Sequence, residues 1–195
     1  MDESLAKIRH ERSKRDFPGL TLEDDEYVEF AFKRAKVCLM MILAGTAFGL
    51  GAILLAFLLI VIAQPALDST GHQFLFIILF ALVAAAFIIS VFSVMIYRGN
   101  RIYITNKHVI QMVMNSPVSN SINIIDLASV EDASYRQDGI LQKMFGYGTF
   151  RLATIGDETT YTFKNSDISS SELKAVTKLI TDAKKSRRFE FGDEN

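Results

Sequence analysis

The sequence predicts an α+β membrane protein, in which a two-helix transmembrane hairpin is followed by a small antiparallel β-barrel or sheet capped by a C-terminal amphipathic helix. Three observations predict this fold. Residues 37–63 and 74–97 contain no charged side chain. Beyond residue 98, apolar and polar residues alternate with the period of two that is typical of strands. Near the C-terminus, apolar residues recur at the spacing that places them on one face of a helix.

Each uncharged run is long enough to cross a bilayer. At about 1.5 Å rise per residue, either run spans a hydrocarbon core of about 30 Å, so we expect helices at about 37–63 and 74–97. Two buried helices of a soluble protein fit less well, because the rest of the chain is too short to cover them. A signal peptide also fits poorly, since no cleavage pattern follows the first run.

The distribution of basic residues predicts the topology. The connection between the spans, residues 64–73, contains neither Lys nor Arg. Basic residues gather at the other ends of the two spans: Lys33, Arg34, Lys36, Arg98, Arg101 and Lys107. The positive-inside rule then predicts a multi-pass membrane protein with both termini in the cytoplasm.

Small residues are spaced along the spans so that helices can approach closely. Gly45 and Gly49 form a GxxxG motif, and Ala81 and Ala85 offer a second pair of small residues four apart. We expect these residues to pack helices together within the hairpin, or alternatively between copies of the chain. Neither span contains Asp, Glu, Lys, Arg or His, the groups that ion pathways usually need. The spans therefore favour an anchor over a transporter or channel subunit, which is kept as a further alternative.

Residues 1–36 form a polar cytoplasmic arm before the first span. Basic residues cluster before a Phe17-Pro18-Gly19 turn signal, and an acidic run follows it. Two interpretations are open: a basic arm that touches anionic headgroups, and a solvated, partly disordered tail. From Tyr27 onward, aromatic residues predict an interfacial helix that turns into the first span.

We expect residues 98–186 to form a cytoplasmic domain of short strands, and residues 187–195 to form a C-terminal tail. The alternation predicts strands at 101–105, 108–114, 118–124, 127–136, 149–155 and 159–164, with a turn at Gly156-Asp157 between the last two. Ser169 and Glu172 make a capping box at the start of the final helix. A sheet this small cannot bury its own core, so we expect it to be covered by the apolar stripe of that helix: Leu173, Val176, Ile180 and Ala183.

Three segments resemble the membrane-associated bacterial pleckstrin-homology (PH) domain family. They are NRIYITNK (100–107), IIDLASV (124–130) and GILQKMFGYGTF (139–150). The last resembles the short helix of that family, which ends in Phe-Gly-x-Gly before the next strand. We expect the apolar side chains of this helix to be buried and Gly146 and Gly148 to permit the turn; the apolar residues are Ile140, Leu141, Met144 and Phe145. Two spans before the domain also match the family layout, which implies a location in the cytoplasmic (inner) membrane. The resemblance covers about residues 27–185.

The resemblance implies a PH-like barrel used for binding or assembly. We therefore expect a membrane-anchored binding or scaffold module that mediates protein interaction or self-assembly at the cytoplasmic face, with membrane lipids and a protein partner or further copies as its partners. The alternative is a module that binds anionic lipid headgroups through Lys107, Lys143 and Lys164. A further basic group either contacts the membrane surface or complements the dipole of the final helix: Lys184, Lys185, Arg187 and Arg188.

Composition and motifs favour neither an enzyme nor a nucleic-acid-binding protein. The chain carries 21 Lys and Arg against 22 Asp and Glu. It therefore lacks the excess of basic residues that is typical of nucleic-acid-binding proteins. His10, His72 and His108 lie in separate regions, so we expect no shared metal site or catalytic triad. Cys38 is the single cysteine, and the sequence contains no phosphate-binding glycine loop or nucleophile elbow. We expect no catalytic residue, no metal and no cofactor.

Overall fold

The computed structural model describes residues 2–64, 68–154 and 160–192. The N-terminal half consists of α1 (Asp2–Asp16), β1 (Val28–Lys33), α2 (Lys36–Ala63) and α3 (Ser69–Gly99). The strands β2 (Arg101–Thr105), β3 (His108–Ser116) and β4 (Ser119–Asp126) follow, and then a 3-10 turn at Leu127–Ser129. The chain ends with β5 (Val130–Arg136), α4 (Ile140–Phe145), β6 (Gly148–Thr154), β7 (Thr160–Ser166) and α5 (Ser170–Gly192). The predicted Gly156-Asp157 turn lies outside the described residues.

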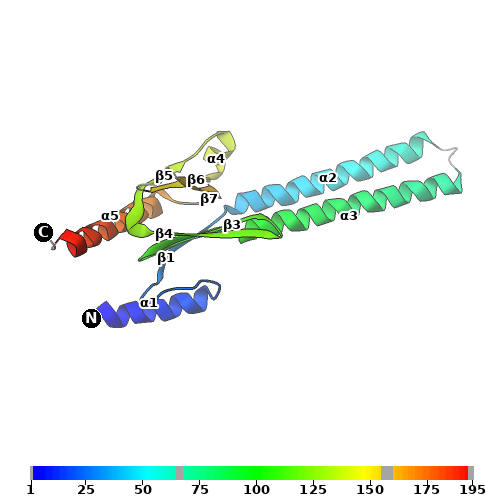
Figure 1. Cartoon of the computed structure of the whole chain (residues 1–195). Helices are drawn as coiled ribbons and strands as arrows, with labels where there is room; N and C mark the ends of the chain where they lie inside the picture. Colours follow the sequence, from blue (N-terminus) through cyan, green and yellow to red (C-terminus); the bar gives the residue numbers. More distant parts are fainter. Residues whose placement is uncertain (1, 65–67, 155–159, 193–195) are drawn as a thin grey trace.

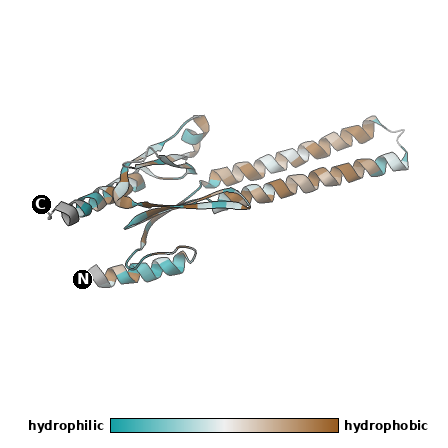
Figure 2. Ribbon diagram, in the orientation of Figure 1, coloured by the Kyte–Doolittle hydropathy of each residue, from teal (hydrophilic) through white to brown (hydrophobic). Residues whose placement is uncertain are grey.

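Helices α2 and α3 form a long antiparallel pair that projects from the strands (Figure 1). Both are long and apolar enough to cross a membrane, and apolar residues run along their whole length (Figure 2). Between them, Thr46 Oγ1 lies 3.2 Å from Ser90 Oγ, and the rings of Phe57 and Phe76 are 5.2 Å apart. The hairpin is therefore joined by mixed polar and aromatic contacts.

The small residues predicted to pack the hairpin do not line this contact. A side-chain carbon added at Gly45 or Gly49 would meet no atom within 4 Å, and Ala81 and Ala85 are exposed. The prediction that Gly45 and Gly49 pack within the hairpin is therefore wrong, because both residues face away from the other helix. Packing between copies stays a prediction.

The first sheet has the strand order β1-β2-β3-β4, with every pair antiparallel. Its first strand, β1, precedes the hairpin and pairs with β2, which follows it: Phe32 lies opposite Ile102. The interfacial helix predicted from Tyr27 onward is therefore wrong. Residues 28–33 are extended because they find a partner strand, and the two long helices are inserted between neighbouring strands of one sheet.

The second sheet has the strand order β5-β6-β7 and shares a core with the first. Side chains from both sheets and α5 meet there, including Ile104, Leu127, Phe150 and Leu152, which are essentially inaccessible to solvent. The described strands form two open sheets and no closed barrel. Of the two predicted forms, a barrel or a sheet, the barrel is therefore wrong. The turn at 127–129 interrupts the strand ladder between β4 and β5, so the sheets face each other without joining edge to edge there.

Helix α5 closes the open side of this core, as predicted. Glu172 Oε2 accepts hydrogen bonds from the N–H and hydroxyl of Ser169 at 2.8 and 2.7 Å, and the Glu172 N–H donates to Ser169 Oγ at 3.2 Å. This is the predicted capping box. Val176 and Ile180 are buried, and Leu173 and Ala183 pack beside them.

The N-terminal arm covers the outer face of the first sheet. It begins with α1 in place of a disordered tail. Leu20 and Leu22 are buried with Tyr103 and Ile110, and the ring of Phe17 packs edge-on against Tyr103 with centroids 5.2 Å apart. The first sheet thus lies between the arm and the main core.

Candidate functional site

Helix α4 carries a group of four large apolar side chains within six residues. Sequence analysis predicted that its apolar residues are buried, but they are exposed: Ile140 84%, Leu141 52%, Met144 65% and Phe145 47%. We call these four residues the α4 apolar surface. The prediction of burial is therefore wrong.

The turns around α4 explain why its side chains point outward. Gly139 and Gly146 adopt positive φ angles of 99° and 72°, a conformation that favours glycine. The hydroxyl of Tyr135 donates to the carbonyl of Gly146 at 3.2 Å, and Tyr147 is buried directly after the helix. Because the backbone of the turn itself lies against the second sheet, the helix is held beside the core with its apolar side chains outside it.

A second feature, which we call the basal cleft, lies where the hairpin meets the strands. Its volume is about 630 Å³. It is bounded by the end of β1, the first residue of α2, the end of α3 and the segment between β7 and α5. Five cationic side chains line it, against the carboxylates of Asp167 and Glu172: Lys33, Arg34, Lys36, Arg98 and Arg101. The cleft is therefore an electropositive site at the base of the hairpin.

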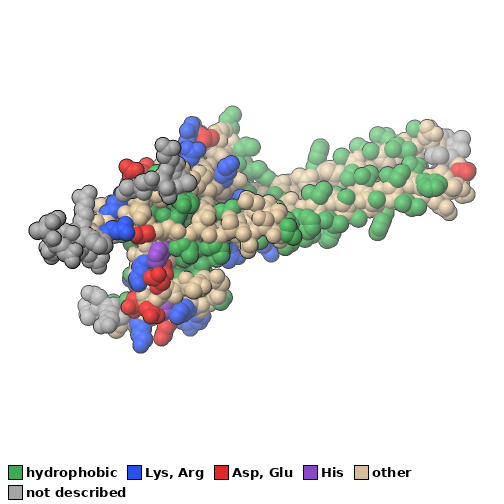
Figure 3. Space-filling model, in the orientation of Figure 1, with side chains coloured by type: hydrophobic (Ala, Val, Ile, Leu, Met, Phe, Trp, Pro, Cys, Tyr) green, Lys and Arg blue, Asp and Glu red, His purple; other side chains and the backbone are tan. Residues whose placement is uncertain are grey.

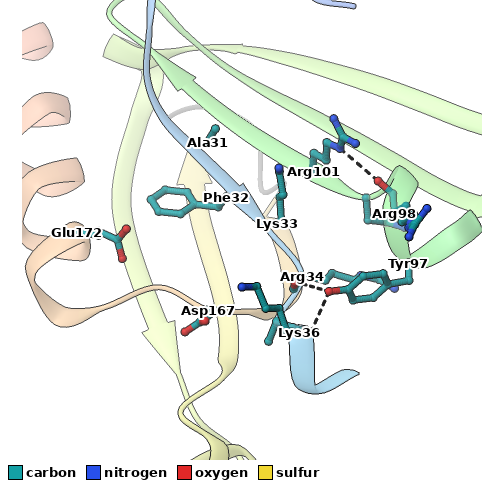
Figure 4. Close-up of a pocket in the computed structure, with 12 residues that line it drawn as sticks. Ala31, Phe32, Lys33, Arg34, Lys36, Tyr97, Arg98, Arg101, Asp167 and Glu172 are labelled. Atoms are coloured by element: carbon teal, nitrogen blue, oxygen red, sulfur yellow. Dashed lines mark hydrogen bonds between the residues drawn. The ribbon is translucent and has the colours of Figure 1, made fainter. Parts of the chain in front are cut away.

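Hydrogen bonds hold the walls of the basal cleft together (Figure 4). The hydroxyl of Tyr97 on α3 donates to the carbonyl oxygens of Arg34 and Ala35 at 2.9 and 3.2 Å. The N–H of Ala35 donates to Asn165 O at 2.7 Å. Arg101 Nε donates to the carbonyl of Arg98 at 3.2 Å. The end of β1 is thus tied both to the last turns of α3 and to the end of β7.

The three lysines predicted to gather a headgroup do not meet. Lys107 Nζ donates to Asp24 O at 2.9 Å and lies 3.6 Å from Glu23 Oε2. Lys143 is on α4 and Lys164 is on β7, and neither lines the basal cleft or the pocket beside Lys107. The headgroup hypothesis for these three lysines stays a prediction, and it gains no common pocket.

The basic residues of α5 lie far from the hairpin. Figure 1 shows α5 running away from the long helices. Lys184 Nζ donates to Glu131 O at 2.9 Å, and Arg187 pairs with Asp126 at 2.7 Å; Lys185 is exposed, and the side chain of Arg188 lies outside the described part. This placement argues against contact with a membrane that the hairpin would span.

A third cluster joins the arm to the sheet and was missed from the sequence. The Glu26 carboxylate is 1% exposed and accepts hydrogen bonds from Thr105 Oγ1 at 2.6 Å and the N–H of Glu23 at 2.9 Å. His108 Nδ1 lies 3.0 Å from Glu26 Oε1, and His10 Nδ1 contacts the Glu26 carbonyl. Two of the three histidines thus meet at one glutamate, through pairings far apart in sequence.

The electrostatics of Glu26 fit a structural role. Burial by itself would raise the pKa of this carboxyl, but the hydrogen bonds from Thr105, the Glu23 N–H and His108 lower the pKa below its ordinary value of 4.5. One oxygen each from Glu23 and Glu26 and a ring nitrogen of His108 lie within 4.8 Å of one another. Since both oxygens of Glu26 already accept hydrogen bonds, the cluster acts as a clasp that holds the arm on the sheet.

Comparison with known proteins bears on the fold. A family model described as "Bacterial PH domain" matches residues 32–184, a range that includes both long helices. One solved structure with detectable similarity is a DUF1696 family protein with a pleckstrin-homology domain from Shewanella loihica PV-4. It is 11% identical, with a TM-score of 0.32 over 44% of this chain and 70% of that one, a likeness too weak to carry an argument. No curated protein matches the sequence.

Proposed function

The chain belongs to the bacterial PH domain family, and on that premise we propose that it is a membrane-anchored binding module. In this proposal α2 and α3 cross the cytoplasmic membrane, and the two sheets dock a protein, or another copy of the chain, at its cytoplasmic face through the α4 apolar surface. The observation that carries the proposal is the exposure of four large apolar side chains on one short helix outside the spans.

The arrangement of the hairpin supports the anchoring. Both sheets, α1 and α5 lie at one end of α2 and α3 (Figure 1), so an inward and an outward crossing would leave them together on one side of a membrane. The connection at residues 64–73 lacks Lys and Arg, whereas Lys33, Lys36 and Arg98 lie at the opposite end. By the positive-inside rule, that opposite end is cytoplasmic.

The α4 apolar surface supports docking. Soluble domains rarely leave large apolar side chains clustered and exposed unless the cluster meets a partner or a membrane. Figure 3 shows hydrophobic side chains gathered at the corner of the strand-rich part that carries α4. Burial of such a cluster in an interface supplies the apolar centre that protein contacts use.

Native mass spectrometry of the full chain, gently extracted from its own membrane, tests the docking. We compare the wild type with an Ile140→Ser/Met144→Ser variant and with a matched control, Ile122→Ser/Ile124→Ser, which removes two exposed isoleucines from β4. The wild type and the control should give a discrete complex, either a multiple of the chain or a fixed ratio with a second protein, and the α4 variant a single chain. Identical masses for all three proteins would refute docking through α4.

A further inference from the structure

Arg34 is the most unusual cation of the basal cleft. Its Nε is buried and lacks a hydrogen-bond partner among the described residues, and its guanidinium forms no ion pair within that part of the chain. Buried polar groups are otherwise almost always satisfied. Although Arg34 as a whole is only partly buried, its Nε can therefore still donate a hydrogen bond that no described residue accepts.

The position of Arg34 is set by its backbone. Residue 34 forms an isolated β-bridge with Ser166 of β7, and its carbonyl accepts the Tyr97 hydroxyl from α3. Figure 4 shows its side chain beside the Tyr97 ring. Strands and a helix on both sides therefore hold the backbone of residue 34 at the wall of the cleft.

The carboxylates of the cleft do not neutralise Arg34. Glu172 Oε2 accepts hydrogen bonds from Ser169 in the capping box, and among the described residues neither Glu172 nor Asp167 forms an ion pair with a cation of the cleft. Lys36 and Arg98 add exposed positive charge at the same opening. The excess of cations over carboxylates favours an anionic ligand, and the planar fork of a guanidinium can donate two parallel hydrogen bonds to a phosphate.

We propose that the basal cleft binds the phosphate group of an anionic phospholipid, with the Arg34 guanidinium as its main donor and Lys36 and Arg98 as supporting cations. The source is a lipid because the cleft lies between the first residue of α2 and the last turn of α3, where a spanning hairpin would leave the hydrocarbon and meet headgroups. The proposal rests on the hairpin crossing the membrane, as in the proposed function. The proposed site is separate from Lys107, Lys143 and Lys164, none of which lines the basal cleft.

Lipid retention by the full chain in nanodiscs tests the site. The wild type, Arg34→Gln and a control, Arg15→Gln, are incorporated into nanodiscs of mixed phosphatidylglycerol and phosphatidylcholine. Phosphatidylglycerol bound to the released protein is then titrated by native mass spectrometry. Arg15 is exposed on α1 and outside the cleft, so it matches the change in charge. Loss of a bidentate phosphate contact should weaken phosphatidylglycerol binding about tenfold in Arg34→Gln and leave Arg15→Gln unchanged.

A second variant and a competition experiment with inorganic phosphate complete the test. Lys36→Gln removes an exposed cation of the cleft and leaves Arg34 in place, and it should weaken binding about threefold. Inorganic phosphate at millimolar concentration should not displace the lipid; displacement would identify a free-phosphate site and overturn the lipid source. Equal phosphatidylglycerol binding by the wild type, Arg34→Gln and Lys36→Gln would refute the site while leaving the membrane anchor intact. Failure of the wild type to enter nanodiscs would instead refute the anchor, and the lipid site with it.

Discussion

Truncation of Glu26 should release the N-terminal arm from the first sheet. In Glu26→Ala, the Thr105 hydroxyl and the His108 ring lose their acceptor, as does the N–H of Glu23. A buried donor left without an acceptor costs about 1–3 kcal/mol. The Thr105 hydroxyl has an alternative acceptor in the His108 carbonyl, 2.9 Å away, so the three losses do not simply add. We expect the arm to be destabilised by about 2–3 kcal/mol.

Amide hydrogen exchange of residues 9–22 in the full chain measures this loss. Since each 1.4 kcal/mol is a factor of ten, exchange through local opening of the arm should accelerate about 30- to 150-fold. The control is Glu29→Ala, which removes an exposed carboxylate 3.2 Å from Arg9 and should change exchange less than about threefold. Equal exchange in the two variants would contradict the clasp.

The same carboxylate predicts a dependence on pH. Because the pKa of Glu26 is lowered in the folded protein, its stabilisation is complete above the ordinary value of 4.5 and is lost as the pH falls through the folded pKa. Exchange of residues 9–22, corrected for the intrinsic rate, should therefore accelerate in the wild type below about pH 4.5. In Glu26→Ala this acceleration should be absent.

Three other predictions concern packing, and each is measured by denaturant unfolding of the full chain in detergent. Leu152→Ala empties a fully buried position of the shared core and should lower the free energy of unfolding by about 2–5 kcal/mol; a loss below about 1 kcal/mol would contradict the core. Gly148→Ala places a carbon 2.6 Å from the Arg136 carbonyl and should cost about 1–3 kcal/mol, because β5 must move; wild-type stability would contradict that close approach. Ser90→Ala removes the contact to Thr46 across the hairpin and should cost about 0.6 kcal/mol, and a loss of several kcal/mol would show that the helices depend on this contact.

The elements predicted best are those with local signals. The capping box of Ser169 and Glu172 and the stripe of α5 need only the spacing of nearby residues, and both are confirmed. The strands from β2 to β7 also follow from alternation within the described residues, with ends shifted by a few positions. Strand β1 was missed because its partner lies on the far side of the hairpin. Alternating Val28, Phe30 and Phe32 were the available signal, and their nearness to a span favoured an interfacial helix instead.

The candidate site was harder to predict than the fold. An apolar face on a short helix does not reveal whether the chain itself buries it, so the exposure of Met144 and its neighbours was unforeseen. Sequence analysis used Arg34 and Arg98 only to predict the orientation of the spans. It did not predict that they line one cleft, because that depends on β1 pairing with β2 across the inserted hairpin. The clasp at Glu26 likewise joins residues about eighty positions apart. Long-range pairing therefore determines each of these sites.

The most direct test of the membrane-anchored binding module is site-specific photo-crosslinking in native membranes. A photoreactive amino acid is placed at Met144 on the α4 apolar surface, and a control probe is placed at Thr181, an exposed position on α5. We predict a discrete protein adduct from position 144, either a dimer of the chain or a complex with one other protein, and none from position 181. Lipid adducts alone at position 144, or the same adducts from both positions, would contradict docking through α4.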